Sequence, residues 1–173
     1  MFKSLGGKPA QVCLAILLLL FLAAPAFAQG PLRVVILPFS VNAKEDLSFL
    51  AKGVRDMMAT RLAWQDKVTV MEHDLVKPVM ERVKPPYNDA KARKLGQEMG
   101  AQVVVFGSMT VFGKAVSLDA RVVKVGKDEP ALTAFIQAPN QDEVIPRIND
   151  FSQRINAEIF KRPLPSGLFC TRK

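Results

Sequence analysis

QVVVFGSMTVF, residues 102–112, is followed by Gly113-Lys114 and then by AVSLDARVVKV, residues 115–125. The first run is rich in β-branched and aromatic residues. The second places four apolar side chains at every second position: Val116, Leu118, Ala120 and Val122. Two strand-like runs joined by a short turn that contains glycine predict a β-hairpin. The alternation in the second run predicts that one face of the hairpin is buried.

Upstream of the hairpin, strand patterns and helix patterns alternate. Residues 33–39 (RVVILPF) form a continuous apolar run, which is typical of a strand buried on both faces. Pro38 predicts the end of this strand or a bulge, because proline cannot donate a ladder hydrogen bond. After a polar stretch at 40–45, which we expect to be a loop, apolar residues recur at three- and four-residue spacing between 47 and 62. That spacing predicts an amphipathic helix, with Asp46 as its N-cap.

The remaining patterns complete a single α/β (α+β) domain. They predict a strand at 68–71, a helix at 73–83, a helix at 89–99 capped by Asn88, a strand at 132–137, and a helix that starts at Asn140 or near Ile145 and ends at Phe160. The order β-α-β-α-α-β-β-β-α predicts a five-stranded sheet of mixed direction packed by helices. With 173 residues, the chain is long enough for one such domain.

The first 28 residues have the three parts of a secretory signal peptide. Lys3 and Lys8 make the start basic, residues 12–24 form an apolar run, and Ala26-Phe27-Ala28 ends it with small residues. We expect cleavage after Ala28; an uncleaved membrane anchor is the alternative. The expected location is the periplasm, and association with the outer membrane or secretion are the alternatives.

The chain is basic, with 24 Lys and Arg residues against 16 Asp and Glu residues. Loss of residues 1–28 removes two lysines and leaves 22 basic against 16 acidic groups, a net charge of +6. An exported chain is not expected to bind nucleic acid, so this charge favours peripheral contact with an anionic envelope surface or an acidic partner. A solvated basic surface without a specific partner is the alternative. The remaining cysteine, Cys170, cannot form an intramolecular disulfide and lies in an expected loose tail at 161–173.

The sequence offers no catalytic constellation. His73 is the only histidine, so neither a Ser-His-Asp arrangement nor a His-rich metal site can be built in the usual way. As a catalytic base it would need a nucleophile, and no nearby residue argues for one, so we expect it to be a loop or cap residue. Neither GxGxxG nor GxxxxGK[ST] occurs, so Gly107 and Gly113 are expected to be a strand kink and a turn. We therefore expect no catalytic residue, no metal and no cofactor.

Three residues are candidates for binding a partner. Phe112 and Lys114 lie at the tip of the hairpin, and Tyr87 follows Pro85-Pro86 in the longest loop. Aromatic residues on loops and tips serve as anchors in protein interfaces. The alternative for Phe112 is that its side chain folds back onto the core.

The order of segments resembles a known family. VVILPF at 34–39, LAKGVRDMMATRL at 50–62 and VTVMEHDLV at 68–76 look like the first half of the TolB N-terminal-like α/β domain of bacterial envelope proteins. ARKLGQEMGAQVVVFGSMT at 92–110, followed by VSLDARVVKV at 116–125, is similar to the second half. The resemblance covers about residues 31–160 and rests on a combination of positions, including Leu95-Gly96, Gly100-Ala101 and Gly107.

This resemblance implies a cell-envelope module that works by binding. Its relatives include flagellar outer-membrane proteins of the FlgO type, the curli-secretion lipoprotein and, in particular, secreted proteins in which such a domain precedes FG-GAP (VCBS-type) repeats. No active-site residue is implied. The expected function is therefore non-enzymatic binding of another envelope protein. An assembly subunit of a secretion or flagellar-base structure, which would form a homo-oligomer, is the first alternative, and a hydrolase is the less favoured second one.

Overall fold

The computed structural model describes residues 30–163 and contains one mixed sheet covered by helices. The elements, in chain order, are β1 (Leu32–Ile36), β2 (Ser40–Asn42), α2 (Ser48–Leu62), β3 (Val68–Val70), α3 (His73–Arg82), α4 (Asp89–Glu98), β4 (Val103–Phe112), β5 (Ala115–Lys124), β6 (Leu132–Ala138) and α5 (Val144–Glu158). The predicted signal peptide at 1–28, Cys170 and most of the predicted tail lie outside the described residues. The α/β class and the order of the predicted elements are confirmed.

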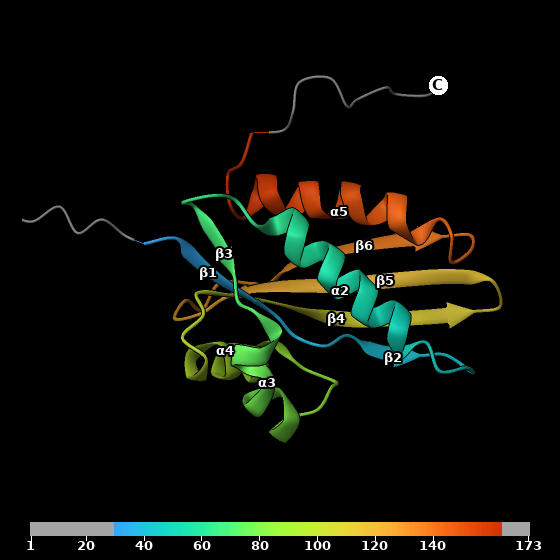
Figure 1. Ribbon diagram of the computed structural model, residues 1–173, viewed down its shortest axis with the longest axis horizontal. Helices are drawn as coiled ribbons and strands as arrows, with labels where there is room; N and C mark the ends of the chain where they lie inside the picture. The colour runs from blue at the N-terminus through green and yellow to red at the C-terminus, as the bar shows by residue number, and fades with distance from the viewer. Residues whose placement is uncertain (1–29, 164–173) are drawn as a thin grey trace, which may run out of the picture.

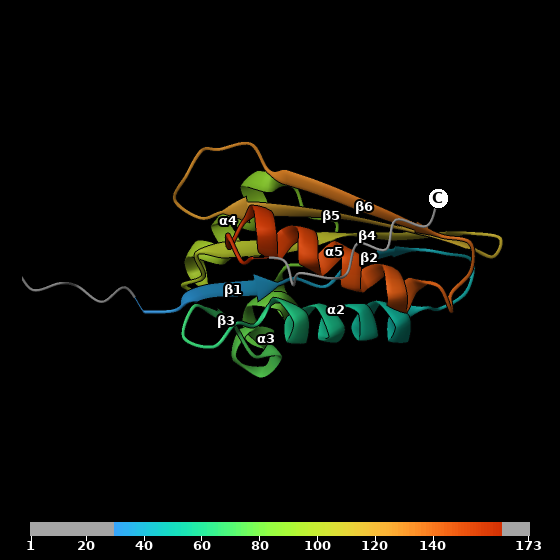
Figure 2. The same ribbon diagram turned by 90° about the horizontal axis from the view of Figure 1, so that it is seen from above.

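The strands form one sheet in the order β3-β1-β4-β5-β6 (Figure 1). β1 pairs in parallel with β3 on one side and with β4 on the other, whereas β4, β5 and β6 form an antiparallel meander. α2 and α5 lie together on one face, and α3 and α4 lie on the other face, near the end where β1 begins (Figure 2). Among residues 30–163, no helix combines the length and the apolarity that a membrane crossing requires.

The sheet has a sixth strand, β2, which the sequence pattern did not predict. The register between the first segment and β4 shifts from Ile36↔Val105 to Ser40↔Ser108, so the three residues 37–39 on one side lie opposite the two residues 106 and 107 on the other. This is a one-residue bulge at Pro38. The polar stretch at 40–45 was expected to be a loop, and that expectation is wrong for Ser40–Asn42, because pairing with β4 resumes after the bulge.

The β4–β5 hairpin is confirmed, with ten paired positions from Val103↔Lys124 to Phe112↔Ala115. Gly113 makes the turn with φ of 62°, a left-handed conformation that favours glycine. The buried side chains of β5 are Val116, Leu118, Ala120, Val122 and Val123. The first four follow the predicted period of two, so the hairpin turns one face to the core.

Two apolar clusters lie on opposite faces of the sheet. The larger one joins α2 and α5 to the sheet and includes Val54, Met58, Ile148, Phe151 and Ile155, all at most 1% exposed. The smaller one lies under α3 and α4 and includes Val35, Leu37, Val76, Leu95 and Phe106. Burial of these side chains is the main term that stabilises the fold, at about 25 cal/mol per Å² of apolar surface removed from water.

Side-chain hydrogen bonds fix the starts of three helices. Asn88 caps α4 as predicted, because its Oδ1 accepts from the Lys91 amide at 2.8 Å. Asp46 was expected to be the N-cap of α2, but the cap position belongs to Leu47, and the Asp46 carboxylate accepts from the Ser48 amide at 2.9 Å. Asn140 accepts from the amide of Glu143, and α5 starts at Val144, close to the alternative start near Ile145.

Candidate functional site

One part of the sheet carries no helix, and we call it the open face. Directly opposite residues of antiparallel strands point to the same side, so the register places Phe112, Ala115 and Phe135 on the face that bears α3 and α4. Those two helices lie at the other end of the sheet (Figures 1 and 2). The open face consists of Ser40, Asn42, Ser108, Thr110, Phe112, Ala115, Ser117, Asp119, Phe135 and Gln137, all exposed or half-buried.

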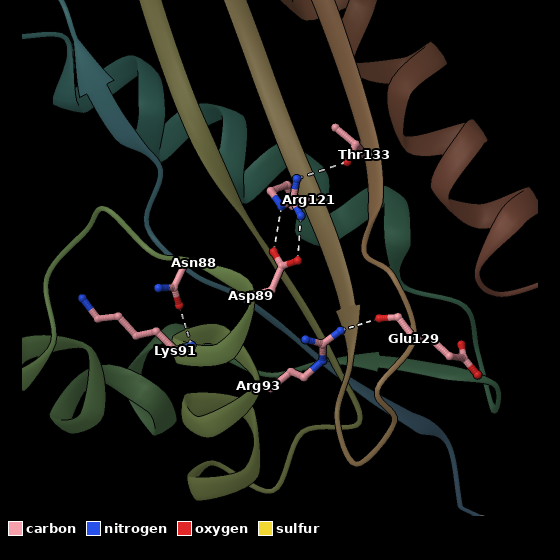
Figure 3. Close-up of polar contacts among 7 residues, drawn as sticks. All are labelled: Asn88, Asp89, Lys91, Arg93, Arg121, Glu129 and Thr133. Carbon is pink, nitrogen blue, oxygen red and sulfur yellow. Dashed lines mark hydrogen bonds and ion pairs between the residues drawn. The ribbon is translucent and has the colours of Figure 1, made fainter.

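An ion pair marks the border between the open face and the covered part. Arg121 of β5 donates from Nε and Nη2 to the two carboxylate oxygens of Asp89, at 2.7 and 2.6 Å (Figure 3). Its Nη1 also donates to the Thr133 hydroxyl at 3.4 Å. The Arg121 hydrogen bonds lower the pKa of Asp89 below its ordinary value, and the same contact raises the pKa of Arg121. This two-pronged bond holds the start of α4 on the sheet.

A second set of contacts holds the other end of the covered part. Arg93 of α4 donates to the backbone carbonyl of Glu129, in the loop between β5 and β6 (Figure 3). Lys124 donates to the Glu129 carboxylate at 2.8 Å, and this bond lowers the pKa of Glu129. Together with the Asp89–Arg121 pair, these contacts keep α4 over the beginning of β4 and leave the rest of that face uncovered.

Phe112 does not fold back onto the core. Its side chain is 89% exposed, the largest value among the exposed large hydrophobic residues of the described chain. Lys114, two residues further on, is also exposed, so the hairpin tip presents an aromatic ring beside a positive charge. Ordinary surfaces scatter single apolar residues, but a phenylalanine that is 89% exposed at the end of a strand contributes little to the packing of its own domain.

Three further large apolar residues are exposed in the described chain besides Phe112 and Leu75. Phe135 of β6 lies on the open face and is 60% exposed. Phe49 in the first turn of α2 and Ile145 in the first turn of α5 are 68% and 50% exposed. Both helices begin at the end of the sheet where the hairpin turns (Figures 1 and 2). Phe135 therefore shares the open face with Phe112, whereas Phe49 and Ile145 belong to helices of the opposite face.

Tyr87 lies elsewhere. Its ring packs edge-on against Phe106 with the centroids 6.4 Å apart, and its hydroxyl donates to the Val83 carbonyl at 3.1 Å. The Lys91 ammonium lies 5.2 Å from the ring centroid, and burial raises the pKa of the phenol. Phe106 and Phe112 are six residues apart on one strand, which corresponds to about 20 Å. The structure thus brings Phe112 and Lys114 together but places Tyr87 in the smaller cluster.

Sequence reasoning missed Phe135, although a signal was present. In the run LTAFIQA, Ala134 and Ala138 are buried and Phe135 takes an outward position. In a strand whose side chains alternate between a buried and an exposed face, an aromatic residue at an exposed position presents its ring to solvent. To predict this for Phe135, one had only to decide which of the two alternating sets of positions is buried. The Asp89–Arg121 pair had no comparable signal, because its members are 32 positions apart.

Polar groups of the open face form hydrogen bonds with one another. Asn42 donates to the Thr110 hydroxyl at 3.3 Å, and the Ser117 hydroxyl lies 3.3 Å from the Asp119 carboxylate.

His73 lies at the start of α3, where its Nδ1 is 2.9 Å from the Arg55 guanidinium. Within residues 30–163, no group of three His, Cys, Asp or Glu side chains gathers in the way that a metal ion requires.

No protein-family model matches this chain, and no curated protein sequence matches it. Solved structures with a similar chain path exist at low identity. The LpoB C-terminal domain from Escherichia coli is 15% identical with a TM-score of 0.49, and the match covers 63% of this chain and 83% of that one. Lipoprotein GNA1162 from Neisseria meningitidis is 19% identical with a TM-score of 0.47, over 75% of this chain and 99% of that one.

TolB from Acinetobacter baumannii is 16% identical with a TM-score of 0.47, and the match covers 76% of this chain and 28% of TolB. These similarities concern the chain path alone. None of them bears on an association with FG-GAP repeats, which stays a prediction. With identities below 20% and TM-scores below 0.5, none of the three assigns a function to this chain.

Proposed function

We propose that this chain is a non-enzymatic binding module of the bacterial cell envelope, and that it binds another envelope protein through the hairpin tip and the open face. The observation that carries the proposal is the 89% exposure of Phe112, on a strand whose adjoining sheet face no helix covers. The secretory signal predicted at 1–28 supports an envelope location.

The side chains of the hairpin tip and the open face indicate what kind of partner this surface fits. Phe112 and Phe135 would each insert into an apolar pocket, as aromatic anchors do at the centres of protein interfaces. The hydroxyl and amide groups of Ser108, Thr110 and Gln137 offer hydrogen bonds at the rim. Lys114 favours a partner with acidic residues beside the pocket that receives Phe112. The expected partner is therefore a protein with an apolar pocket that has an acidic rim.

The experiment places a photo-crosslinking phenylalanine analogue at Phe112 in the full-length chain produced in cells. Leu75 provides the matched control, because it is 73% exposed but lies on α3, away from the tip. We expect a discrete heterologous envelope protein to be captured from position 112 and not from position 75. Equal capture from both positions, or no capture from position 112, would contradict the proposal.

The first alternative function, an assembly subunit, makes a different prediction in the same experiment. A ring-forming subunit presents the tip to a second copy of itself, so position 112 would capture ladders of this chain alone. Sedimentation of the purified protein at high concentration separates the two: a monomer supports the binding module, and a closed oligomer supports the assembly subunit. Substitution of Phe112 by Ser, with the crosslinking residue moved to the exposed Lys114, is expected to abolish heterologous capture. It is expected to leave the unfolding midpoint unchanged, because Phe112 is 89% exposed.

A further inference from the structure

A cavity on the opposite side of the sheet from the open face has the chemistry of a ligand site. It lies between α2 and α5, has a volume of about 360 Å³, and its polar lining is Arg61, Asn149, Ser152, Gln153, Asn156 and Arg162. Cavities that hold small ligands start at about 300 Å³. No carboxylate lines it, and within residues 30–163 neither Arg61 nor Arg162 forms a salt bridge.

Both arginines are held in place by neutral groups. Arg61 donates from Nη1 to the Met57 carbonyl at 3.1 Å and from Nε to Asn149. Arg162 donates from Nη1 to the Ala63 carbonyl at 3.3 Å, and its guanidinium lies 5.5 Å from the centre of the Trp64 ring. Their positive charges are therefore oriented but not neutralised, and a guanidinium fork matches a carboxylate in two-pronged geometry.

Two residues that line the same cavity each have a buried polar atom without a partner. Ser152 is 1% exposed and Asn156 is 7% exposed. Among the described residues, neither Ser152 Oγ nor Asn156 Oδ1 has a hydrogen-bond partner. The Asn156 amide nitrogen donates to the Arg61 carbonyl at 2.9 Å, which fixes the side chain with its oxygen as the free acceptor. Leaving a buried polar group without a partner is unfavourable, so a ligand group that pairs with both atoms is expected at this cavity.

The complementary ligand has two parts. An anion would be bound by Arg61 and Arg162 and would accept a hydrogen bond from the Ser152 hydroxyl. A neighbouring N–H group would donate to Asn156 Oδ1. A carboxylate next to an amide N–H combines both, and this pair is found at the free C-terminal end of a peptide whose last residue is not proline. We propose that this cavity binds a small acylamino carboxylate, the class that a peptide C-terminus represents.

Trp64 supplies the signal for the test, because it is the only tryptophan of the chain and lies under the Arg162 guanidinium. The full mature chain is titrated with N-acetylalanine while tryptophan fluorescence is recorded. N-acetylalanine amide, which keeps the N–H group but has no carboxylate, is the matched ligand control. We expect a saturable change with N-acetylalanine and at least tenfold weaker binding of the amide.

Three variants locate the site. Ser152→Ala and Arg61→Gln are each expected to weaken binding of N-acetylalanine at least fivefold. Arg154→Gln is the control: it changes an exposed arginine of α5, the helix that carries Ser152, at a position outside the cavity. It is expected to leave binding unchanged. If Arg61→Gln fails to fold, Ser152→Ala, which removes only a buried hydroxyl, still decides the question. No saturable change, equal binding of the amide, or binding indifferent to Ser152→Ala overturns the proposal.

Discussion

Gly107 lies where the β4 backbone passes closest to its neighbours. A Cβ atom added there would be 2.0 Å from the Asp119 carbonyl oxygen and 2.9 Å from an atom of the Phe39 ring. The bulge at Pro38 brings Phe39, which is 5% exposed, over this position. The space of a side chain on β4 is thus filled by a ring from the neighbouring segment, so glycine at this position is a packing requirement, while the register with β5 continues through it without interruption.

We expect Gly107→Ala to lower the free energy of unfolding by about 3 kcal/mol or to prevent folding, because backbone atoms cannot yield as a flexible side chain can. Gly53→Ala is the matched control: no atom lies within 4 Å of the added Cβ in helix α2, and alanine should stabilise that helix by about 1 kcal/mol. Denaturant unfolding of both variants measures the difference. Equal stability of the two proteins would show that the strands separate easily at Gly107.

The Asp89–Arg121 pair makes the stability of the domain depend on pH. The pKa of Asp89 in the folded protein lies below the ordinary value of 3.8. Its contribution to the free energy of unfolding is therefore fully present above pH 3.8 and is lost as the pH falls through the folded pKa. The two side chains are 28% and 44% exposed, and solvent screening limits the gain.

Asp89→Asn is therefore expected to lower the free energy of unfolding by about 0.5–1 kcal/mol at pH 7. The difference from the parent protein should be smaller at pH 2 than at pH 7, because the contribution of the charged carboxylate is lost as the pH falls through the folded pKa of Asp89. Chemical unfolding at the two pH values, with added salt as a further check, measures it. A deficit of equal size at pH 2 would mean that the charge of Asp89 is not the cause.

At the scale of elements, the patterns that were local in sequence could be predicted and the long-range ones could not. The hairpin and α4 carry their alternation, turn glycine and cap within a few residues. β2 has three residues without an apolar pattern, and it is a strand only because the bulge returns the chain to β4, 68 positions away. The cavity between α2 and α5 brings Arg61 next to Asn156, 95 positions apart, and no spacing rule connects them.

Helix α4 depends on its cap, because it has only ten residues and sits at the border of the open face. Asn88→Ala removes the acceptor for the Lys91 amide and is expected to lower the free energy of unfolding by about 1 kcal/mol. Asn88→Ser retains an oxygen in capping reach and should lose only a few tenths of a kcal/mol by the same measure. Thermal unfolding by circular dichroism compares the two, and an equal loss in both variants would argue against a capping role.

At the scale of the whole molecule, the two apolar clusters share one sheet, so we expect them to unfold together. Phe106→Ala empties part of the cluster under α3 and α4 and should cost about 3–5 kcal/mol. Trp64 packs against the other cluster. Its fluorescence should nevertheless shift to a lower denaturant midpoint in Phe106→Ala, by as much as the far-ultraviolet circular dichroism signal does. An unchanged Trp64 transition would show that the layers unfold separately.

The pairing of β1 also determines how the domain answers to mechanical load. β1 is the strand nearest the N-terminal end of the described chain, and it is hydrogen-bonded to parallel neighbours along both edges. Tension applied at Pro31 along the strand must shear both rows of hydrogen bonds at once. Tension applied at Pro163 acts first on α5. This helix is held on the sheet largely by side-chain packing, so it can detach one turn at a time. A pull between these two points therefore releases the last helix first and leaves the first strand anchored in the sheet.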